Sequence, residues 1–406
     1  MSTHLPAQKR SAAAIAIVLF IAVAVGRVHE LVPALSSLQL GKLTIVLAFF
    51  MTVFFAGNKN RVRDSRIARK MLWFSALIVL SVAFSVWTAG SFEFLLVQLP
   101  TMVFLFFLVY VTAANEQTLE FYLRFLVWFL VIFAAFGITG LTSDRLAFST
   151  TYDPNDIGLV VLVLSAFIIG LSLDSNRKYV LAYRALGAIG FAVVIATQSR
   201  GAFLGLCVVI TYFLFANRDS ERMRLYSAPK VSALVGVTLL LVLAIALAPD
   251  EAWLRIQTIF ELEDDYNTSG DRGRLAIWGR GLVAFLERPW GFGVGAYMSA
   301  DLSVGGSWQT AHNIFIQVLV ELGLIGFILF LGLCFSVWIT GRQLLLRRET
   351  MQHGVSYISN FALGHALRAS ILAYVTCGFF LSMAYASLFY YLLGMTAAIA
   401  ALRLPK

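Results

Sequence analysis

The chain has 406 residues, of which 60% are hydrophobic and only 13% are charged. Soluble domains carry about 25% charged residues, so the composition excludes a soluble protein. Apolar runs of about 18 to 25 residues recur along the chain and are long enough to cross a bilayer as helices. The runs are continuous rather than alternating, which excludes a transmembrane barrel. We therefore predict an all-α polytopic membrane protein.

The formal net charge of +9 invites a nucleic-acid partner, but most of the charges fall in short segments between apolar runs. This placement favours contact with membrane lipids over nucleic acid. Cys207, Cys334 and Cys377 all lie within apolar runs, so we expect packing residues rather than disulfides or metal ligands.

The N-terminal run admits two interpretations. Lys9-Arg10, an apolar stretch to Val25 and a small-residue site at Ala22 to Ala24 resemble a signal peptide. We favour an uncleaved first span, because the distribution of lysines and arginines between the spans fits the positive-inside rule when this span is kept. The predicted spans are twelve: 11–27, 39–57, 71–88, 94–113, 121–140, 155–173, 179–197, 201–216, 231–249, 312–340, 368–385 and 387–403.

Lysines and arginines concentrate in alternate connecting segments, above all in 58–70 and 217–230. The positive-inside rule then places both termini in the cytoplasm and the long 250–311 segment outside. The two basic segments are expected to set the topology and to contact anionic lipid. Without an internal repeat or a soluble domain in the sequence, residues 1–406 are predicted to form a single integral membrane domain.

The 250–311 loop is predicted to contain two short helices. Residues 250–263 place apolar side chains on one face and suit a helix lying in the membrane interface. The second helix, 274–287, is predicted to place on one side Leu275, Trp278, Leu282 and Phe285. Arg288-Pro289 ends it, and the glycines of 291–295 turn the chain back to the bilayer. A phosphate-binding loop would need a preceding strand, which the pattern lacks.

Three spans are predicted to begin at the outer face with distinctive residues. One begins at Asp153-Pro154-Asn155-Asp156, with an N-cap and a proline at the first helical position. The others begin at Gln198-Ser199-Arg200 and at His312-Asn313. Helix N-termini present backbone N–H groups and suit anions. If these ends converge, they form a pocket for a phosphate group.

Arginines favour the same chemistry. Arg200 lies at the predicted outer boundary, and Arg272 and Arg274 lie at a helix start, where a cation opposes the helix dipole. Such local conflicts often mark function, and guanidinium groups bind phosphate in a bidentate way. Two structural interpretations stay open. Arg200 could extend to lipid headgroups, and Arg272 and Arg274 could pair with nearby acids, namely Asp264, Asp265 or Asp271.

His312 is a candidate general base. A helix start lowers the proton affinity of a histidine, and neutral imidazole can accept a proton from a hydroxyl group. The alternative is an ordinary interfacial residue. Glu321 lies about 13 Å further along that span, where it must be protonated, paired or hydrogen-bonded, and we expect a structural role near Gly323. Gly323 and Gly326 are expected to be close-packing contacts.

The acids of the outer loop form a solvated run with no histidine at ligand spacing, and the 89–93 segment offers only Glu93. We therefore expect chemistry that needs neither metal nor cofactor.

Several of these residues form a recognisable pattern. It comprises Thr197 to Ala202 (TQSRGA), Arg274 to Trp278 followed by Pro289 to Gly293 (PWGFG), and His312-Asn313 followed by Glu321 to Gly326 (ELGLIG). Asp153 to Asp156 (DPND) adds to it. The chain resembles the O-antigen ligase and O-antigen polymerase superfamily over the sixth to tenth predicted spans, and the predicted span number also fits.

The resemblance implies a GT-C-type glycosyltransferase of the bacterial inner membrane with its active site in the periplasm. It implies inverting, metal-independent transfer of a glycan from undecaprenyl pyrophosphate to a sugar hydroxyl. Arg200, Arg274 and Arg272 would hold the pyrophosphate and His312 would be the base. Asn313, Asp153, Asn155 and Glu321 would support them.

Members of this superfamily differ in the acceptor that receives the glycan. A ligase uses the lipid A-core of lipopolysaccharide, a polymerase uses another lipid-linked repeat unit, and related enzymes glycosylate proteins. One long late outer loop favours the ligase by analogy. A transporter of lipid-linked sugars is the alternative from another class, but it would show two similar halves and charges at mid-membrane.

Overall fold

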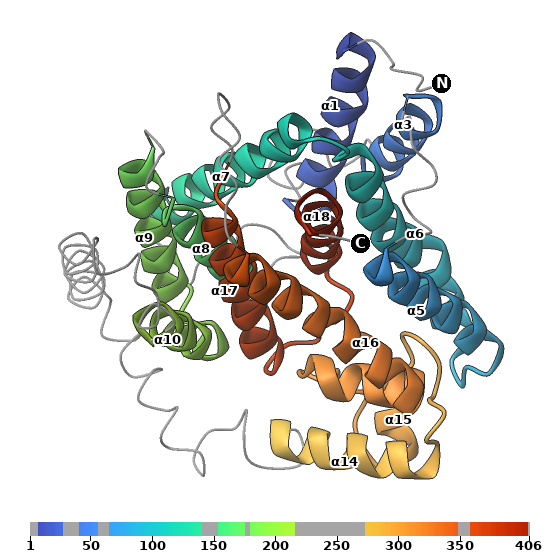
Figure 1. Cartoon of the computed structure of the whole chain (residues 1–406). Helices are drawn as coiled ribbons and strands as arrows, with labels where there is room; N and C mark the ends of the chain where they lie inside the picture. Colours follow the sequence, from blue (N-terminus) through green and yellow to red (C-terminus); the bar gives the residue numbers. More distant parts are fainter. Residues whose placement is uncertain are drawn as a thin grey trace. The chain divides into compact units, whose positions relative to one another are not determined.

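A computed structural model describes residues 7–26, 40–55, 65–139, 153–174, 179–215, 273–347 and 358–404 (Figure 1). All regular structure in these ranges is helical, which confirms the predicted all-α class. The helices are α1 (Ala7–Ala24), α3 (Leu40–Phe55), α5 (Arg66–Ala83), α6 (Thr88–Thr112), α7 (Glu116–Thr139), α8 (Pro154–Leu171), α9 (Val180–Ala196), α10 (Arg200–Phe215), α14 (Arg274–Glu287), α15 (Tyr297–Ser303), α16 (Ile314–Leu346), α17 (Asn360–Gly378) and α18 (Ser387–Arg403).

Each predicted span overlaps one of these helices, except 231–249, which lies outside the described residues together with the predicted helix 250–263. Among the described residues, four stretches are long and apolar enough to cross a membrane: Thr88–Thr112, Glu116–Ala135, Pro154–Leu171 and Ile314–Leu346. Shorter apolar helices accompany them. These helices support a membrane protein, while the total of twelve spans stays a prediction.

Two of the predicted span starts lie several residues after the observed helix starts. Helix α5 begins at Arg66 rather than at 71, where the Ser65 hydroxyl oxygen accepts the Ala68 N–H at 3.2 Å. Helix α17 begins at Asn360 rather than at 368, where Ser359 caps the Ala362 N–H at 3.2 Å. Hydropathy starts a span after the last charged residue, whereas a helix starts at its cap. The start of α5 therefore includes Arg66, Arg69 and Lys70, which the prediction left outside the span. Residues 360–367 at the start of α17 include no Asp, Glu, Lys or Arg, so charge does not explain the start that was missed there.

The chain divides into two compact units. Unit 1 comprises residues 1–125, 266–340 and 382–406, and unit 2 comprises 126–265 and 341–381. In unit 2, α8 packs against α9, α10 and α17, and almost all of α8 is buried. Gly170 of α8 meets the backbone of Ala366 in α17 so closely that no side chain would fit between them. Small residues thus allow close helix packing, as in other membrane bundles.

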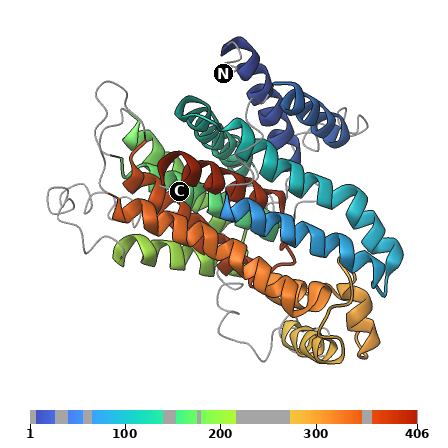
Figure 2. The same ribbon diagram turned by 45° about the vertical axis from the view of Figure 1, so that its right-hand side comes forward.

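In unit 1, α6 packs against α1, α3, α5 and α18. Helix α5 runs alongside α16, as Figure 2 shows. The Lys70 ammonium group of α5 donates to the Gly332 carbonyl oxygen and to the Ser336 hydroxyl oxygen of α16, both at 2.9 Å. The rings of Phe74 and Phe330 pack nearby, with centroids 6.2 Å apart. These contacts hold α16, the helix that follows His312.

Helix α16 is interrupted at Gly323, which has a φ of 66° and a ψ of −169°. The segment 289–293 pairs with the break: Phe292 and Gly293 donate their N–H groups to the carbonyl oxygens of Val320 and Glu321, both at 2.9 Å. In return, Leu324 donates to the Pro289 carbonyl oxygen at 3.0 Å. The expectation that Gly323 and Gly326 form a simple packing pair was therefore wrong for Gly323. This glycine allows a backbone conformation that exposes helix hydrogen-bonding groups to a neighbouring loop.

We expect Gly323→Ala to destabilise the protein. The positive φ alone costs roughly 1–3 kcal/mol for a residue with a Cβ, and that Cβ would also overlap the Pro289 carbonyl oxygen. The measurement is the thermal unfolding midpoint of the detergent-solubilised protein. Gly279→Ala is the matched control, because nothing lies within 4 Å of its Cβ position and alanine favours a helix. An unchanged midpoint for Gly323→Ala would contradict the role of the break.

Candidate functional site

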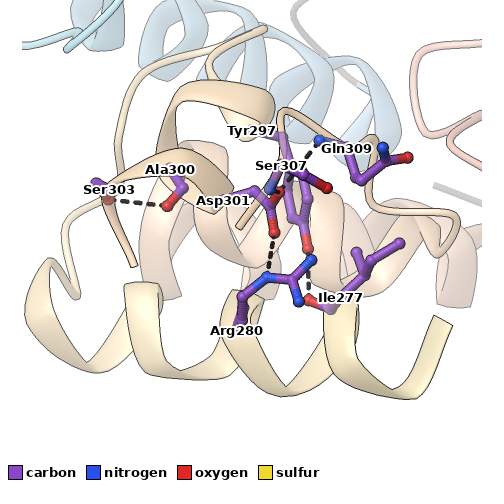
Figure 3. A network of polar contacts seen from close by, with 8 residues as sticks. All are labelled: Ile277, Arg280, Tyr297, Ala300, Asp301, Ser303, Ser307 and Gln309. Carbon is purple, nitrogen blue, oxygen red and sulfur yellow. Dashed lines mark hydrogen bonds and ion pairs between the residues drawn. The ribbon is translucent and has the colours of Figure 1, made fainter. Parts of the chain in front are cut away.

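The segment between α15 and α16 is organised by Asp301, whose side chain is 0% exposed (Figure 3). Its Oδ1 accepts a hydrogen bond from Arg280 Nε of α14 at 2.7 Å. Its Oδ2 accepts the backbone N–H groups of Ser307 at 3.0 Å and Gln309 at 3.1 Å. A single carboxylate thus ties α14, α15 and the approach to His312 together. A buried charge is tolerated here because it is paired and hydrogen-bonded.

Tyr297 joins α14 to α15 beside this pair. Its hydroxyl donates to the Ile277 carbonyl oxygen at 3.1 Å and lies against Gly281, where a Cβ would leave no room for it (Figure 3). Burial, followed by the nearby Asp301 charge, raises the pKa of the Tyr297 hydroxyl. The group therefore stays protonated and can only donate or share this bond as a neutral phenol.

We expect Asp301→Ala to lower stability by roughly 3–5 kcal/mol, because it leaves the Arg280 charge buried without its carboxylate. Limited proteolysis of residues 297–313 and the thermal midpoint would both report this loss. The control is Glu120→Ala, which breaks the more exposed pair with Arg124 within α7 and should change little. Equal effects of the two substitutions would contradict the organising role of Asp301.

His312 is held by neighbours on both sides. Trp278 of α14 donates its indole N–H to the carbonyl oxygen of the preceding Ala311 at 3.0 Å. The His312 backbone N–H donates to the Ser382 hydroxyl oxygen at 2.8 Å, and its ring Nε2 lies 3.1 Å from the Thr310 hydroxyl oxygen. The φ of His312 is 45°, which non-glycine residues seldom adopt. Strained backbone of this kind is common at functional sites.

Side chains cap two of the three helix starts that we predicted to bind an anion, and the predicted N-cap at Asp153 is confirmed. Asn313 is buried, and its Oδ1 accepts the N–H groups of Phe315 at 2.8 Å and Ile316 at 3.1 Å. At α8, Asp153 Oδ1 accepts the N–H groups of Asn155 at 2.7 Å and Asp156 at 2.9 Å. Side-chain caps therefore occupy N–H groups that we expected to be open to a phosphate. Asn313 and Asp153 act first on their own helices.

The arginines lie in different parts of the chain. Arg274 is the first residue of α14, and the preceding Gly273 offers no side chain to cap the helix. Arg274 precedes Trp278 by four residues, which places the two on one helix face about 6 Å apart along the axis. Arg200 is the first residue of α10 in unit 2. Arg272 lies outside the described residues.

Glu321 is buried beside the α16 break. Its Oε2 accepts a hydrogen bond from the Tyr385 hydroxyl at 2.8 Å, and the backbone N–H groups of Gly295 and Tyr297 also point to the carboxylate. The ring of Tyr385 packs edge-on against Phe94, with centroids 4.7 Å apart. Glu321 therefore connects α16, the 289–297 segment and the start of α18 within unit 1.

The predicted helix 274–287 is confirmed, but the apolar residues predicted on one side of it are not the ones that pack most closely against α15. Leu275 and Leu282 are exposed, whereas the residues buried against α15 and the 289–297 segment are Ile277, Gly281 and Ala284. Close approach of α15 to α14 needs small residues at the contact, and Gly281 and Ala284 supply them. Trp278 and Phe285, from the predicted face, are partly buried at the edge of this core.

Sequence reasoning assigned no positioning role to Trp278, Asp301 or Ser382. Trp278 already belonged to the quoted motif, so its spacing from Arg274 was a usable signal. The Ser382 hydroxyl contacts His312, which is 70 residues away in the chain. The Asp301 carboxylate contacts Arg280, 21 residues away, and backbone N–H groups of the irregular segment after α15. No local pattern indicates such contacts.

A family model described as O-antigen ligase matches residues 185–331. The match includes the three motifs that contain Arg200, Arg274 and His312, and it confirms the resemblance to the O-antigen ligase superfamily. No curated protein matches the chain.

Proposed function

We propose that this protein is an O-antigen ligase that transfers a glycan from undecaprenyl pyrophosphate to a sugar hydroxyl of lipid A-core. The observation that carries the proposal is the contact between Trp278 and Ala311, which connects the helix of Arg274 to the segment of His312. The residue proposed to bind phosphate and the residue proposed as the base thus belong to connected elements of unit 1. The family match at 185–331 supports the same chemistry.

In the proposed reaction, the guanidinium group of Arg274 binds the pyrophosphate of the donor, together with Arg200 and Arg272. Arginine suits this role because its planar group binds phosphate oxygens in pairs. Negative charge grows on the pyrophosphate as it leaves, so fixed positive groups stabilise the transition state more than the ground state.

His312 is the proposed general base. The acceptor hydroxyl oxygen attacks the anomeric carbon, and a new glycosidic bond forms as the bond to the pyrophosphate oxygen breaks. The electron pair of the broken bond stays on undecaprenyl pyrophosphate, and the hydroxyl proton moves to the His312 imidazole. Attack opposite to the leaving group inverts the anomeric centre. No metal, cofactor or nucleotide takes part in this proposal.

The proposed setting is a GT-C-type bundle of twelve spans in the bacterial inner membrane. Both termini would be cytoplasmic, and the 250–311 loop would cover a periplasmic reaction centre. Asn313, Asp153, Asn155 and Glu321 support it by fixing helix starts and the α16 break. The charge distribution between spans supports this orientation.

The test uses purified protein in nanodiscs with undecaprenyl-pyrophosphate-linked glycan and lipopolysaccharide that lacks O-antigen. We expect the glycan on lipid A-core and equimolar release of undecaprenyl pyrophosphate. If longer glycans formed on the donor lipid without any need for lipopolysaccharide, the protein would be a polymerase rather than a ligase. If the intact donor crossed vesicle membranes without any glycan transfer, the protein would be a transporter rather than an enzyme.

A further inference from the structure

Helix α14 has apolar side chains on the face opposite to its contact with α15. The buried face contains Ile277, Gly281 and Ala284. The opposite face is exposed and consists of Leu275, Gly279, Leu282, Val283 and Leu286, which recur at helical spacing. Leu286 is 73% exposed. A helix in an aqueous loop would place polar residues there, so this face needs an apolar partner.

The exposed face continues onto the surface of α16. Trp290, which is 66% exposed, follows Leu286 by four residues and lies in the 289–293 segment that pairs with the α16 break. The backbone of Trp290 touches Gly323, and the next residues of α16, Leu324 and Ile325, are exposed. Because α16 is long and apolar enough to span the bilayer, these α16 side chains are expected to face lipid.

The sequence of α16 sets the level of this patch relative to the bilayer. Between Glu321 and Arg342 it has no charged residue, and that stretch rises about 30 Å, the thickness of the hydrocarbon core. This charge-free stretch puts the break at Gly323 at one boundary of the core, eleven residues inward of the start at 312 that we predicted for this span. The 289–293 segment lies at the same boundary, because it is hydrogen-bonded to residues 320–324.

The flanking residues are those of a membrane interface. The Arg288 guanidinium group lies over the ring of Trp290, 6.0 Å from its centroid, and over that of Phe292 at 5.2 Å. Tryptophan and arginine concentrate where the hydrocarbon core meets the headgroups. Ser303, the last residue of α15, and Ser307 in the segment after it are polar and exposed.

We propose that α14 is an interfacial membrane helix whose Leu275, Leu282, Val283 and Leu286 side chains insert among the lipid acyl chains of one leaflet. The helix would thus be held between α15 on one side and the bilayer on the other. This inference concerns the position of α14 and does not depend on the proposed reaction.

The experiment measures the accessibility of nitroxide spin labels in nanodiscs by power saturation. Labels go on Leu282→Cys and Leu286→Cys, with Ile328→Cys on the exposed face of α16 as the lipid reference and Ser307→Cys as the water reference. All labelled variants also carry Cys207→Ala, because Cys207 is exposed and would itself react with the label. Cys334 and Cys377 are buried and are kept. Oxygen concentrates in the bilayer, whereas a neutral nickel chelate stays in water. Variants that elute as a single species are compared.

We expect the labels at 282 and 286 to resemble the one at 328, with oxygen accessibility several-fold above that of the nickel chelate. Accessibility to nickel equal to that at 307 would overturn the proposal, since the face would then meet water. Low accessibility to both reagents would also overturn it, because another protein segment or a second copy would then cover the face.

Discussion

We expect His312→Asn to lower the rate of glycan transfer by roughly 10²–10⁴-fold, the usual contribution of a general base. Asparagine is the informative replacement because it tolerates a positive φ, such as the 45° of His312, and keeps the backbone N–H that donates to Ser382. The substitution thus removes the imidazole and leaves the local backbone contacts in place. Alanine would combine the loss of the base with backbone strain.

The measurement is the initial rate of transfer at saturating donor and acceptor, together with the thermal midpoint of each variant. His4→Ala is the matched histidine control, since the positive-inside rule predicts a cytoplasmic N-terminus, away from the proposed reaction centre. We expect the midpoint of His312→Asn to stay close to that of the parent. A variant that is stable and transfers glycan at the parent rate would exclude His312 as the base.

The second large effect concerns Arg274. We expect Arg274→Ala to lower transfer by roughly 10²–10³-fold, because it removes a group that stabilises charge on the leaving pyrophosphate. Arg274→Lys should recover only part of this loss, since an ammonium group keeps the charge but cannot make paired contacts with phosphate oxygens. Both kcat and the KM for the donor should change, whereas the KM for lipopolysaccharide should not.

Arg288→Lys serves as the control for this series. Arg288 directly follows α14, and its guanidinium group lies over the rings of Trp290 and Phe292. Arg288→Lys removes an arginine at the end of α14 and leaves the proposed phosphate site unchanged. Equal losses in the Arg274→Lys and Arg288→Lys variants would show that α14 tolerates neither change, and would remove the special role of Arg274.

Much of the fold could be predicted from hydropathy, because membrane helices are long and uniformly apolar. The predicted span 387–403 coincides with α18, and 39–57 lies within two residues of α3 at each end. The start of α5 was misplaced because its cap, Ser65, precedes charged residues that hydropathy excludes, and the start of α17 at its cap, Ser359, was also missed. The break in α16 was also missed, since Gly323 fits equally well in a close-packed helix.

The candidate site was less predictable. Arg274 and His312 were identified as candidates by their residue types at helix starts, and the hydrogen bond between Trp278 and Ala311 now connects their elements. The N-cap at Asp153 was predicted from the sequence. The side-chain cap at Asn313, whose Oδ1 accepts two backbone N–H groups of α16, was not. The Asp301 network depends on side chains brought together only by the fold. The face of α14 that packs against α15 could not be read from the sequence, because apolar residues occur on both sides of this helix.

The most direct test of the proposed chemistry is an electron cryomicroscopy structure of the protein in nanodiscs with undecaprenyl pyrophosphate bound. The account predicts diphosphate density against the guanidinium groups of Arg274 and Arg200, with the His312 ring on the side from which an acceptor hydroxyl would approach. Diphosphate bound away from Arg274 and His312, or at the opposite membrane surface, would contradict it.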